Sequence, residues 1–143
     1  MKVLETLKSA REALDTPEKW ARGSSARSAS GRKVAVQSKR AAAFCAAGAI
    51  CRAGGAGSEL TRNALFRVFQ ALPFEPEKRF GRHWGNLSQV PSDRGGISGP
   101  IWEAIARVSD DPSTTHADIL ALFDRAIAAE EAAQPRRPKV SIP

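Results

Sequence analysis

Apolar residues recur every three to four positions in four stretches of the chain, which is the spacing of a helix that buries one face. In the first stretch, for example, Val3, Leu7 and Leu14 fall on one stripe. Prolines follow the first three stretches closely, and proline does not continue a helix. The predicted helices cover residues 2–15, 59–72, 100–108 and 114–133.

A fifth helix is predicted over residues 38–53, which are mostly alanine with some cysteine and glycine. The sequence GGAG at 54–57 ends it, because glycine adopts the left-handed cap conformation without steric cost. Neighbours can pack close to so slim a helix, so we expect it at the centre of the fold. Gly48 inside it costs about 1 kcal/mol relative to alanine, and the close approach of another helix would justify that cost.

Helix starts are marked by residues that suit the first turn of a helix. Pro17 predicts one short helical turn, with Trp20 as an apolar anchor behind it. Ser58 is suited to cap the third long helix. Thr115, followed three residues later by Asp118, resembles a capping box at the start of the last helix.

The segments between the predicted helices lack apolar periodicity. Residues 21–33 are rich in glycine, serine and arginine and predict a loop, whereas residues 33–37 alternate and predict a brief extended stretch. One such stretch does not make a sheet, so the pattern predicts an all-α fold. We expect a single compact domain of about five helices over residues 1–133. A long irregular loop at 73–100 joins its third and fourth helices, and a basic, proline-rich, disordered tail follows at 134–143.

Length and cysteine usage narrow the class of protein. A chain of 143 residues fits one domain. It has no apolar run near the roughly 20 residues that span a bilayer, and its first residues lack the apolar core of a signal peptide. On one helix Cys45 and Cys51 would point about 240° apart, so they cannot form a disulfide, and a packing role is expected. These features predict a cytoplasmic protein without a membrane partner.

The net charge is +7, and its distribution along the chain is uneven. Between Lys19 and Ser58 there are eight basic residues and no acidic one. Between Glu103 and Glu131 seven acidic residues accompany only two basic ones. This asymmetry predicts one positive and one negative face, and the positive face suits an anionic partner. The alternative, left equally open, is that the charge only keeps the molecule soluble.

Nucleophilic catalysis would need a cysteine beside a base, and Cys45 or Cys51 could pair with His83 or His116. However, no nucleophile elbow and no oxyanion-forming glycine pattern surrounds either cysteine, and apolar neighbours raise the pKa of a thiol. The segments GGAG and RGGISG lack the Lys-Ser/Thr ending of a phosphate-binding loop. We therefore predict no catalytic residue and no cofactor, and a cysteine-dependent enzyme is the third-ranked function.

Asp110, Asp111, His116 and Asp118 form the densest cluster of acids and histidine in the sequence. A metal site is one interpretation, and helix capping is the other. Aspartates just before Pro112 bond the backbone of a turn, and Asp118 suits the positive start of the last helix. His116 would then be exposed at the first helical position. We favour capping and predict no metal site, since two cysteines and two histidines give no zinc-finger spacing.

Binding of nucleic acid, or of an acidic protein surface, has the strongest support in the sequence. Lysine and arginine neutralise backbone phosphates and release counterions, and an exposed tryptophan stacks on a base. Trp84 is equally suited to anchor its loop on the core, and no named nucleic-acid-binding motif is recognisable. The candidate residues form two sets, Arg22, Arg27, Arg32, Lys33, Lys39 and Arg40 in the first and Arg79, Arg82, Trp84 and Arg94 in the second. The oligomeric state stays open.

The runner-up function is a regulator or inhibitor that acts through protein–protein contacts, of the kind that phages and mobile elements carry. Charged loops on a helical scaffold suit such a role. An inhibitor of a nucleic-acid-handling complex usually exposes an acidic surface that imitates phosphate. The acidic last helix leaves that interpretation open.

Four segments together resemble a known but uncharacterised family of small helical proteins in bacteria and their phages. They are WARG at 20–23, GRKV at 31–34, AAFCAAGAI at 42–50 and SDDPSTTHADILALFDRAI at 109–127. Ser109-Asp110-Asp111 stands where this family usually has Trp-Asn-Asp, and the region 73–100 departs from its pattern. The resemblance implies a small helical fold and no particular activity.

Overall fold

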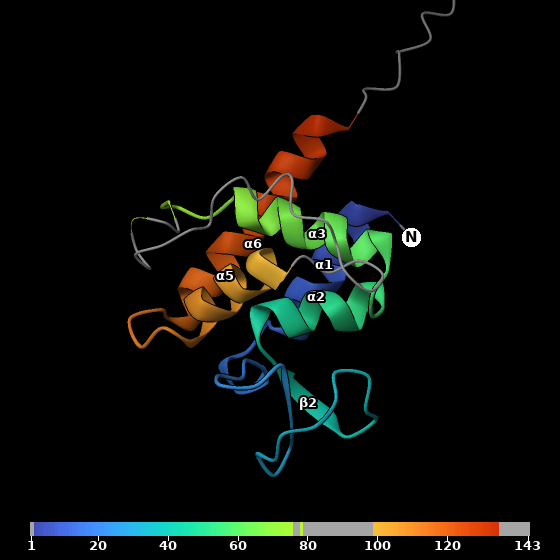
Figure 1. Ribbon diagram of the computed structural model, residues 1–143, viewed down its shortest axis with the longest axis vertical. Coiled ribbons are helices and arrows are strands. Elements are labelled where there is room, and N and C mark those ends of the chain that lie inside the picture. The colour runs from blue at the N-terminus through green and yellow to red at the C-terminus, as the bar shows by residue number, and fades with distance from the viewer. Residues whose placement is uncertain (1, 76–77, 79–98, 135–143) are drawn as a thin grey trace, which may run out of the picture.

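The computed structural model describes residues 2–75, 78 and 99–134. Within them the helices are α1 (Val3–Ala13), α2 (Ala46–Gly54), α3 (Glu59–Gln70), α5 (Gly99–Asp110) and α6 (His116–Ala133). Between α1 and α2 lie a short 3-10 helix, η1 (Pro17–Lys19), and two antiparallel strands, β1 (Ala26–Ser28) and β2 (Ala41–Phe44). The predicted single, mostly helical domain of about five helices is confirmed, with a small sheet added (Figure 1).

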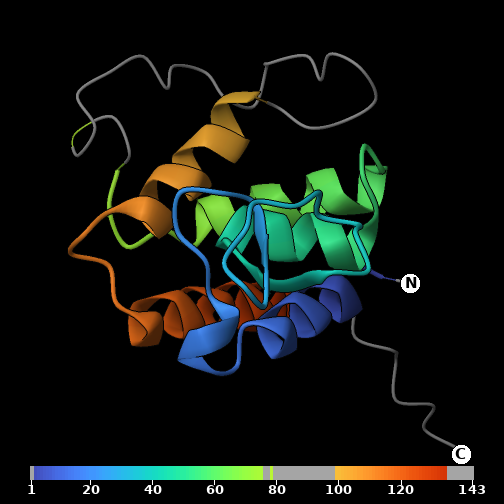
Figure 2. The same ribbon diagram turned by 90° about the horizontal axis from the view of Figure 1, so that it is seen from below.

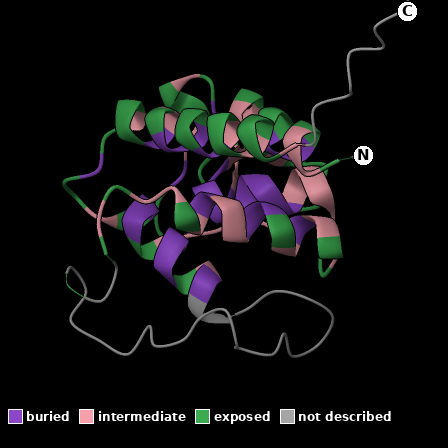
Figure 3. Ribbon diagram, turned by 90° about the horizontal axis from the view of Figure 1, so that it is seen from above, coloured by how far each residue is buried: buried purple, intermediate pink, exposed green. Residues whose placement is uncertain are grey.

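All five α-helices contribute to one core. Helix α1 packs against α2, α3 and α6, while α5 packs against α2 and α3. Figure 2 shows α1 and α6 along the lower side of the molecule, with α2 and α3 above them in that view. Each helix supplies a large, fully buried side chain, namely Leu7, Ile50, Leu65, Ile105 and Phe123. Buried positions accordingly lie where the helices face one another, and exposed positions lie on their outer faces (Figure 3).

The predicted helix starts and stops hold at three places. Ser58 Oγ accepts a hydrogen bond from Thr61 N at 3.0 Å and caps α3. Thr115 and Asp118 form a full capping box at the start of α6, with each side chain accepting from the other's backbone N–H. Helix α2 ends at Gly54, within the predicted GGAG stop, and Gly55 has a positive φ of +92° that favours glycine, although its ψ of 143° is not that of the predicted left-handed cap.

The predicted start of the second helix is wrong. Residues 38–45 are not helical, and α2 begins only at Ala46 because residues 41–44 form β2. Strand β2 pairs with β1, placing Ala26 opposite Phe44, and Cys45 N donates to Ser25 O at 3.1 Å. Alanine favours a helix by less than about 1 kcal/mol per residue, so distant backbone pairing overrides its preference.

The prediction that no sheet forms is also wrong, because the serine- and arginine-rich segment 21–33 contains β1. Its backbone bonds hold a tight turn, in which Ser28 N donates to Arg32 O at 2.8 Å. The predicted extended stretch at 33–37 is reduced to an isolated bridge between Lys33 and Arg27. Apolar periodicity does not reveal these pairings, because backbone groups make them and the strands hold few large apolar side chains.

Gly48 does mark a close approach, although its neighbour is not a helix. A Cβ atom at this position would lie 2.1 Å from Ser25 O, which is far inside van der Waals contact. The backbone just before β1 therefore lies directly against α2, and only glycine leaves room for it.

The segment from Trp20 to Cys45 leaves the helical body after η1 and returns at α2, and we call it the ribbon. Its base, residues 20–27 and 41–45, lies against the helices, and its tip, residues 28–40, holds the connecting loops. Figure 1 shows the ribbon below α2, and Val34 and Val36 of its tip pack against the core. The loops of the ribbon thus cover one side of α2 and expose their outer residues.

Two predicted features fall outside the described residues. The long loop is described only at its two ends, because residues 76–77 and 79–98 are not described, and the tail is described only at Gln134. Both stay predictions. Among the residues that are described, no helix is long and apolar enough to cross a membrane.

Candidate functional site

The ribbon base is joined to the helices through a buried serine of α5. Trp20 Nε1 donates to Ser109 Oγ at 2.9 Å, and Ala46 N at the start of α2 donates to the same oxygen at 3.3 Å. The Ser109 residue is fully buried. One hydroxyl thus satisfies a ribbon side chain and the first N–H of a core helix, both of which would otherwise lack an acceptor.

Two further contacts fasten the base to the turn between α5 and α6. The Arg22 guanidinium lies 4.4 Å above the centre of the Trp20 ring and donates to Thr114 O. Asp110 accepts a hydrogen bond from Gly23 N at 2.8 Å. Asp110 was predicted to bond the backbone of its own turn but bonds the ribbon instead, whereas Asp111 does bond its turn by accepting from Ser113 N at 2.8 Å.

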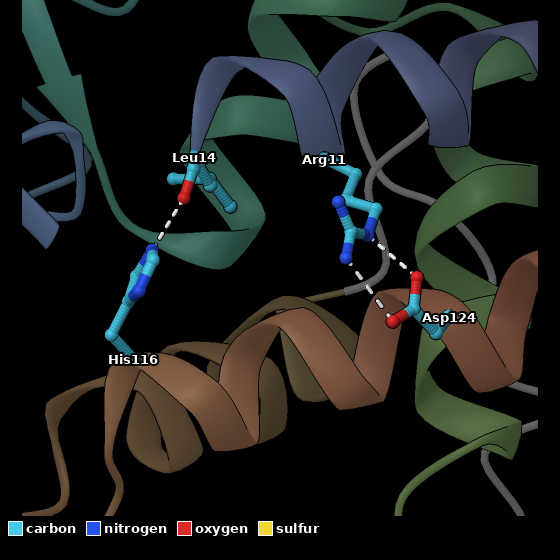
Figure 4. Close-up of polar contacts among 4 residues, drawn as sticks. All are labelled: Arg11, Leu14, His116 and Asp124. Atoms are coloured by element: carbon cyan, nitrogen blue, oxygen red, sulfur yellow. Dashed lines mark hydrogen bonds and ion pairs between the residues drawn. The ribbon is translucent and has the colours of Figure 1, made fainter. Parts of the chain in front are cut away.

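His116 is not exposed, contrary to the sequence prediction. It is half-buried, and its Nε2 lies 2.6 Å from Leu14 O at the end of α1 (Figure 4). The ring centre also lies 6.2 Å from that of Trp20. The start of α6 meets the end of α1, and the imidazole N–H satisfies a carbonyl that the helix leaves free. No group of three or more His, Cys, Asp or Glu side chains gathers as a metal site in the described part of the chain.

Two arginines hold the loops of the tip in place. Arg27 Nε and Nη2 donate to Arg22 O at 3.2 and 3.0 Å, and its Nη1 donates to Gly31 O at 3.0 Å. Arg52 of α2 donates from Nη1 to Val36 O and to Ser38 O, both at 2.8 Å. The guanidinium groups of these arginines serve the backbone of the ribbon, so the tip has a defined shape.

The remaining cations of the ribbon tip are exposed and have no partner in the described part of the chain. The side chains of Arg32, Lys33, Lys39 and Arg40 form no hydrogen bond or ion pair with the described residues. We call these four residues the tip cations. Three of them border an open hollow of about 720 Å³ between the loops, which is lined by Ser28, Ala29, Ser30, Arg32, Lys33, Val34 and Arg40. The structure therefore brings together part of the first predicted binding set.

The acidic residues of α5 and α6, by contrast, are mostly engaged. Arginines pair with three of their carboxylates in contacts of 2.6 to 3.0 Å, namely Arg11–Asp124 (Figure 4), Arg67–Glu130 and Arg107–Glu103. Asp110 bonds the ribbon, and Asp118 caps α6. Three carboxylates of the predicted negative face are thus ion-paired within the molecule.

Both cysteines lie in the core and are not joined by a disulfide. Cys45 is the N-cap of α2, and its Sγ accepts a hydrogen bond from Gly48 N at 3.2 Å. Burial raises the pKa of the Cys45 thiol to about 11 and also raises the pKa of Cys51. A thiol that stays protonated at neutral pH is a poor nucleophile, so neither cysteine is prepared for catalysis.

The second predicted binding set lies outside the described residues, since Arg79, Arg82, Trp84 and Arg94 all fall within 79–98. In the first set the structure separates Arg22 and Arg27, which bond the ribbon and the turn before α6, from the exposed tip cations. Sequence reasoning missed the bond between Trp20 and Ser109 entirely. The only feature of the sequence that linked Trp20 and Ser109 was that both lie in segments that resemble the family.

Comparison with known proteins places most of the chain in one family. A family model described as "Family of unknown function (DUF6197)" matches residues 1–129. No curated protein and no solved structure matches the chain. The resemblance to an uncharacterised family is therefore confirmed, and it brings no activity with it.

Proposed function

The chain belongs to this family of unknown function, and from that premise we propose that it is a non-enzymatic protein that binds the phosphate backbone of nucleic acid. The observation that carries the proposal is the set of tip cations, which project from the helical body without an acidic partner among the described residues. No acidic residue occurs anywhere between Lys19 and Ser58 to oppose them.

Unpaired cations favour this function on energetic grounds. When a cation already forms an ion pair, binding a phosphate must break that pair first, so the net gain is small. The tip cations form no such pair with any residue that the structure describes, and each phosphate that they contact releases condensed counterions into solution. Four contacts give a slope of about −3.6 for the logarithm of affinity against the logarithm of salt concentration. Affinity would then fall about 150-fold between about 50 and 200 mM salt.

Binding to labelled DNA, followed by fluorescence anisotropy as salt is raised, tests the proposal. We expect the steep salt dependence above for the natural chain. The variant Arg32→Gln/Lys33→Gln/Lys39→Gln/Arg40→Gln should lose most of the affinity and keep the same melting temperature, because these side chains bond no other part of the described structure. An affinity that is insensitive to salt, or unchanged in this variant, would contradict the proposal.

An acidic protein surface would engage the same four cations and is the second prediction. Polyglutamate, added as a competitor, distinguishes the two partners. If polyglutamate of equal charge concentration displaces DNA completely, the tip responds to charge alone, and a protein partner becomes the better proposal. The expected result is weak competition, because charge is denser along a nucleic-acid backbone. The predicted cytoplasmic location belongs to the proposal as well. A regulator or inhibitor of phage or bacterial origin, acting through protein–protein contacts, stays the alternative.

A further inference from the structure

The hollow at the ribbon tip is lined by groups that suit phosphate oxygens. Arg32 and Lys33 border it from one loop and Arg40 from the other. Two hydroxyls lie between them, with Ser28 Oγ and Ser30 Oγ 2.9 Å apart. Ammonium, guanidinium and hydroxyl groups all donate hydrogen bonds, and phosphate oxygens accept them. A sugar–phosphate strand that crosses the hollow would therefore meet donors on both sides.

The two aromatic side chains of the ribbon, in contrast, are partly or wholly buried. Trp20 and Phe44 are the only two aromatic residues between positions 20 and 45. The Trp20 ring has Arg22 over one face and is bonded to Ser109, while Phe44 is only 6% exposed. Proteins that bind single strands generally stack bases on exposed aromatic rings, which contributes about 1–3 kcal/mol per base. The hollow has no aromatic residue among those that line it.

Where no base stacks on an aromatic ring, affinity depends on how densely the phosphates are spaced and how well their positions are fixed. A duplex carries one negative charge per about 1.7 Å of its axis and holds its phosphates in fixed positions. A single strand has fewer condensed counterions to release, and it loses conformational freedom when it is bound. From this difference we infer that the ribbon tip binds double-stranded nucleic acid through its phosphates, in preference to single strands and without reading the bases. This inference rests on the proposed function and names its ligand.

Anisotropy titrations of the full chain test the inference with three DNA probes at one salt concentration. The probes are a mixed-sequence duplex, one of its strands alone, and a duplex of scrambled sequence. We expect the two duplexes to bind within about twofold of each other, and the single strand about tenfold more weakly. A single strand that binds as tightly as the duplex, or a marked difference between the duplexes, overturns the inference and leaves the proposed function standing. Failure of all three probes to bind overturns both.

The variant Ala29→Trp tests the physical reason directly. Ala29 is exposed and lines the hollow, so an indole at this position would supply the missing stacking platform. Single-strand affinity should rise about tenfold, while duplex affinity stays within about twofold. If the indole leaves single-strand binding unchanged, stacking is not what limits it and the inference fails.

Discussion

The base and the tip of the ribbon both carry arginines but differ in what those side chains do. At the base, Trp20, Arg22 and Arg27 all bond groups within the molecule, including a buried serine and backbone carbonyls. At the tip, Arg32 and Arg40 are exposed and bond nothing with their side chains among the described residues. Arg22 reaches Thr114 O and Arg27 reaches Arg22 O and Gly31 O, whereas the side chains of Arg32 and Arg40 bond no carbonyl of the described residues.

This difference distinguishes arginines that stabilise the ribbon from arginines that are free to bind a partner, and charge alone does not distinguish them. All four arginines count equally in the net charge of +7, yet binding a phosphate would require Arg22 or Arg27 to give up bonds that hold the ribbon. The tip cations would give up only water and counterions. Substitutions at the base should therefore lower stability, and substitutions at the tip should lower binding.

We expect the largest loss in the free energy of unfolding from Gly48→Ala, because the added methyl group would overlap the base of the ribbon. The new Cβ would lie 2.1 Å from Ser25 O, so the backbone of the ribbon must move. Overpacking of this kind costs about 3 kcal/mol, more than the helix preference of alanine returns. The matched change at the tip is Gly31→Ala, which meets no atom within 4 Å but has a φ of +87°. It should cost about 1 kcal/mol. Equal losses in urea unfolding would remove the distinction between base and tip.

The thiol at the end of the base should make stability depend on alkaline pH. Burial raises the pKa of Cys45 to about 11, from an ordinary value of 9.0. Because the folded state keeps the proton longer, its stabilising contribution is complete below pH 9 and is lost as the pH rises toward 11. The loss in the free energy of unfolding over that window is about 2–3 kcal/mol.

The control for this titration is Cys45→Ser, which can still accept the bond from Gly48 N but does not titrate in this range. Urea unfolding of both proteins at pH 8 and near pH 10.5 isolates the contribution of the thiol. A serine variant that loses as much stability as the natural chain would show that Cys45 is not its source.

The next largest effect is expected from removing the Ser109 hydroxyl, which joins the base of the ribbon to the core. Ser109→Ala leaves Trp20 Nε1 and Ala46 N without their acceptor, and an unsatisfied buried donor costs about 1–3 kcal/mol. We expect a loss of about 2 kcal/mol in the free energy of unfolding. Trp20→Phe, alone and combined with Ser109→Ala, completes a double-mutant cycle that should give a coupling above about 0.5 kcal/mol. Strict additivity would mean that the two side chains do not interact.

The smallest effects come from exchanging matched pairs of arginines. Arg22→Gln/Arg27→Gln removes bonds to three backbone carbonyls and the contact over Trp20, and should cost about 1–2 kcal/mol. Arg32→Gln/Arg40→Gln should change the unfolding free energy by less than about 0.5 kcal/mol. Thermal melting of the two variants, which carry the same charge, compares base with tip directly. Similar melting temperatures would contradict the assignment of Arg22 and Arg27 to structure.

The same contrast explains how much the sequence could predict. Helices with a clear apolar stripe, such as α1 and α3, lie within about two residues of their predicted bounds, because burial of that stripe determines them. The capping box at Thr115 could also be predicted, because its two residues are only three positions apart in the sequence. Local sequence patterns therefore predict most of the helices of the core.

What escaped prediction depends on contacts between distant segments. The alanines of β2 favour a helix and give no sign of the pairing with β1. The sequence likewise places His116 at the surface, although the imidazole bonds Leu14 O. For the candidate site, the charge pattern points to the segment that contains the tip cations, and binding there stays a prediction. Charge did not tell which arginines are engaged, because their acceptors are backbone carbonyls, and every residue of whatever type supplies one.

Salt dependence of DNA binding in two matched lysine variants tests the central claim most directly. Lys33→Gln/Lys39→Gln alters the tip, and Lys2→Gln/Lys8→Gln removes the same charge from equally exposed lysines at the start of the chain. If the tip holds the phosphates, the first variant lowers the salt slope by about 1.8 and the second leaves it unchanged. Equal reductions in both variants would show that DNA responds to the net charge of the protein, and would contradict a binding site at the tip.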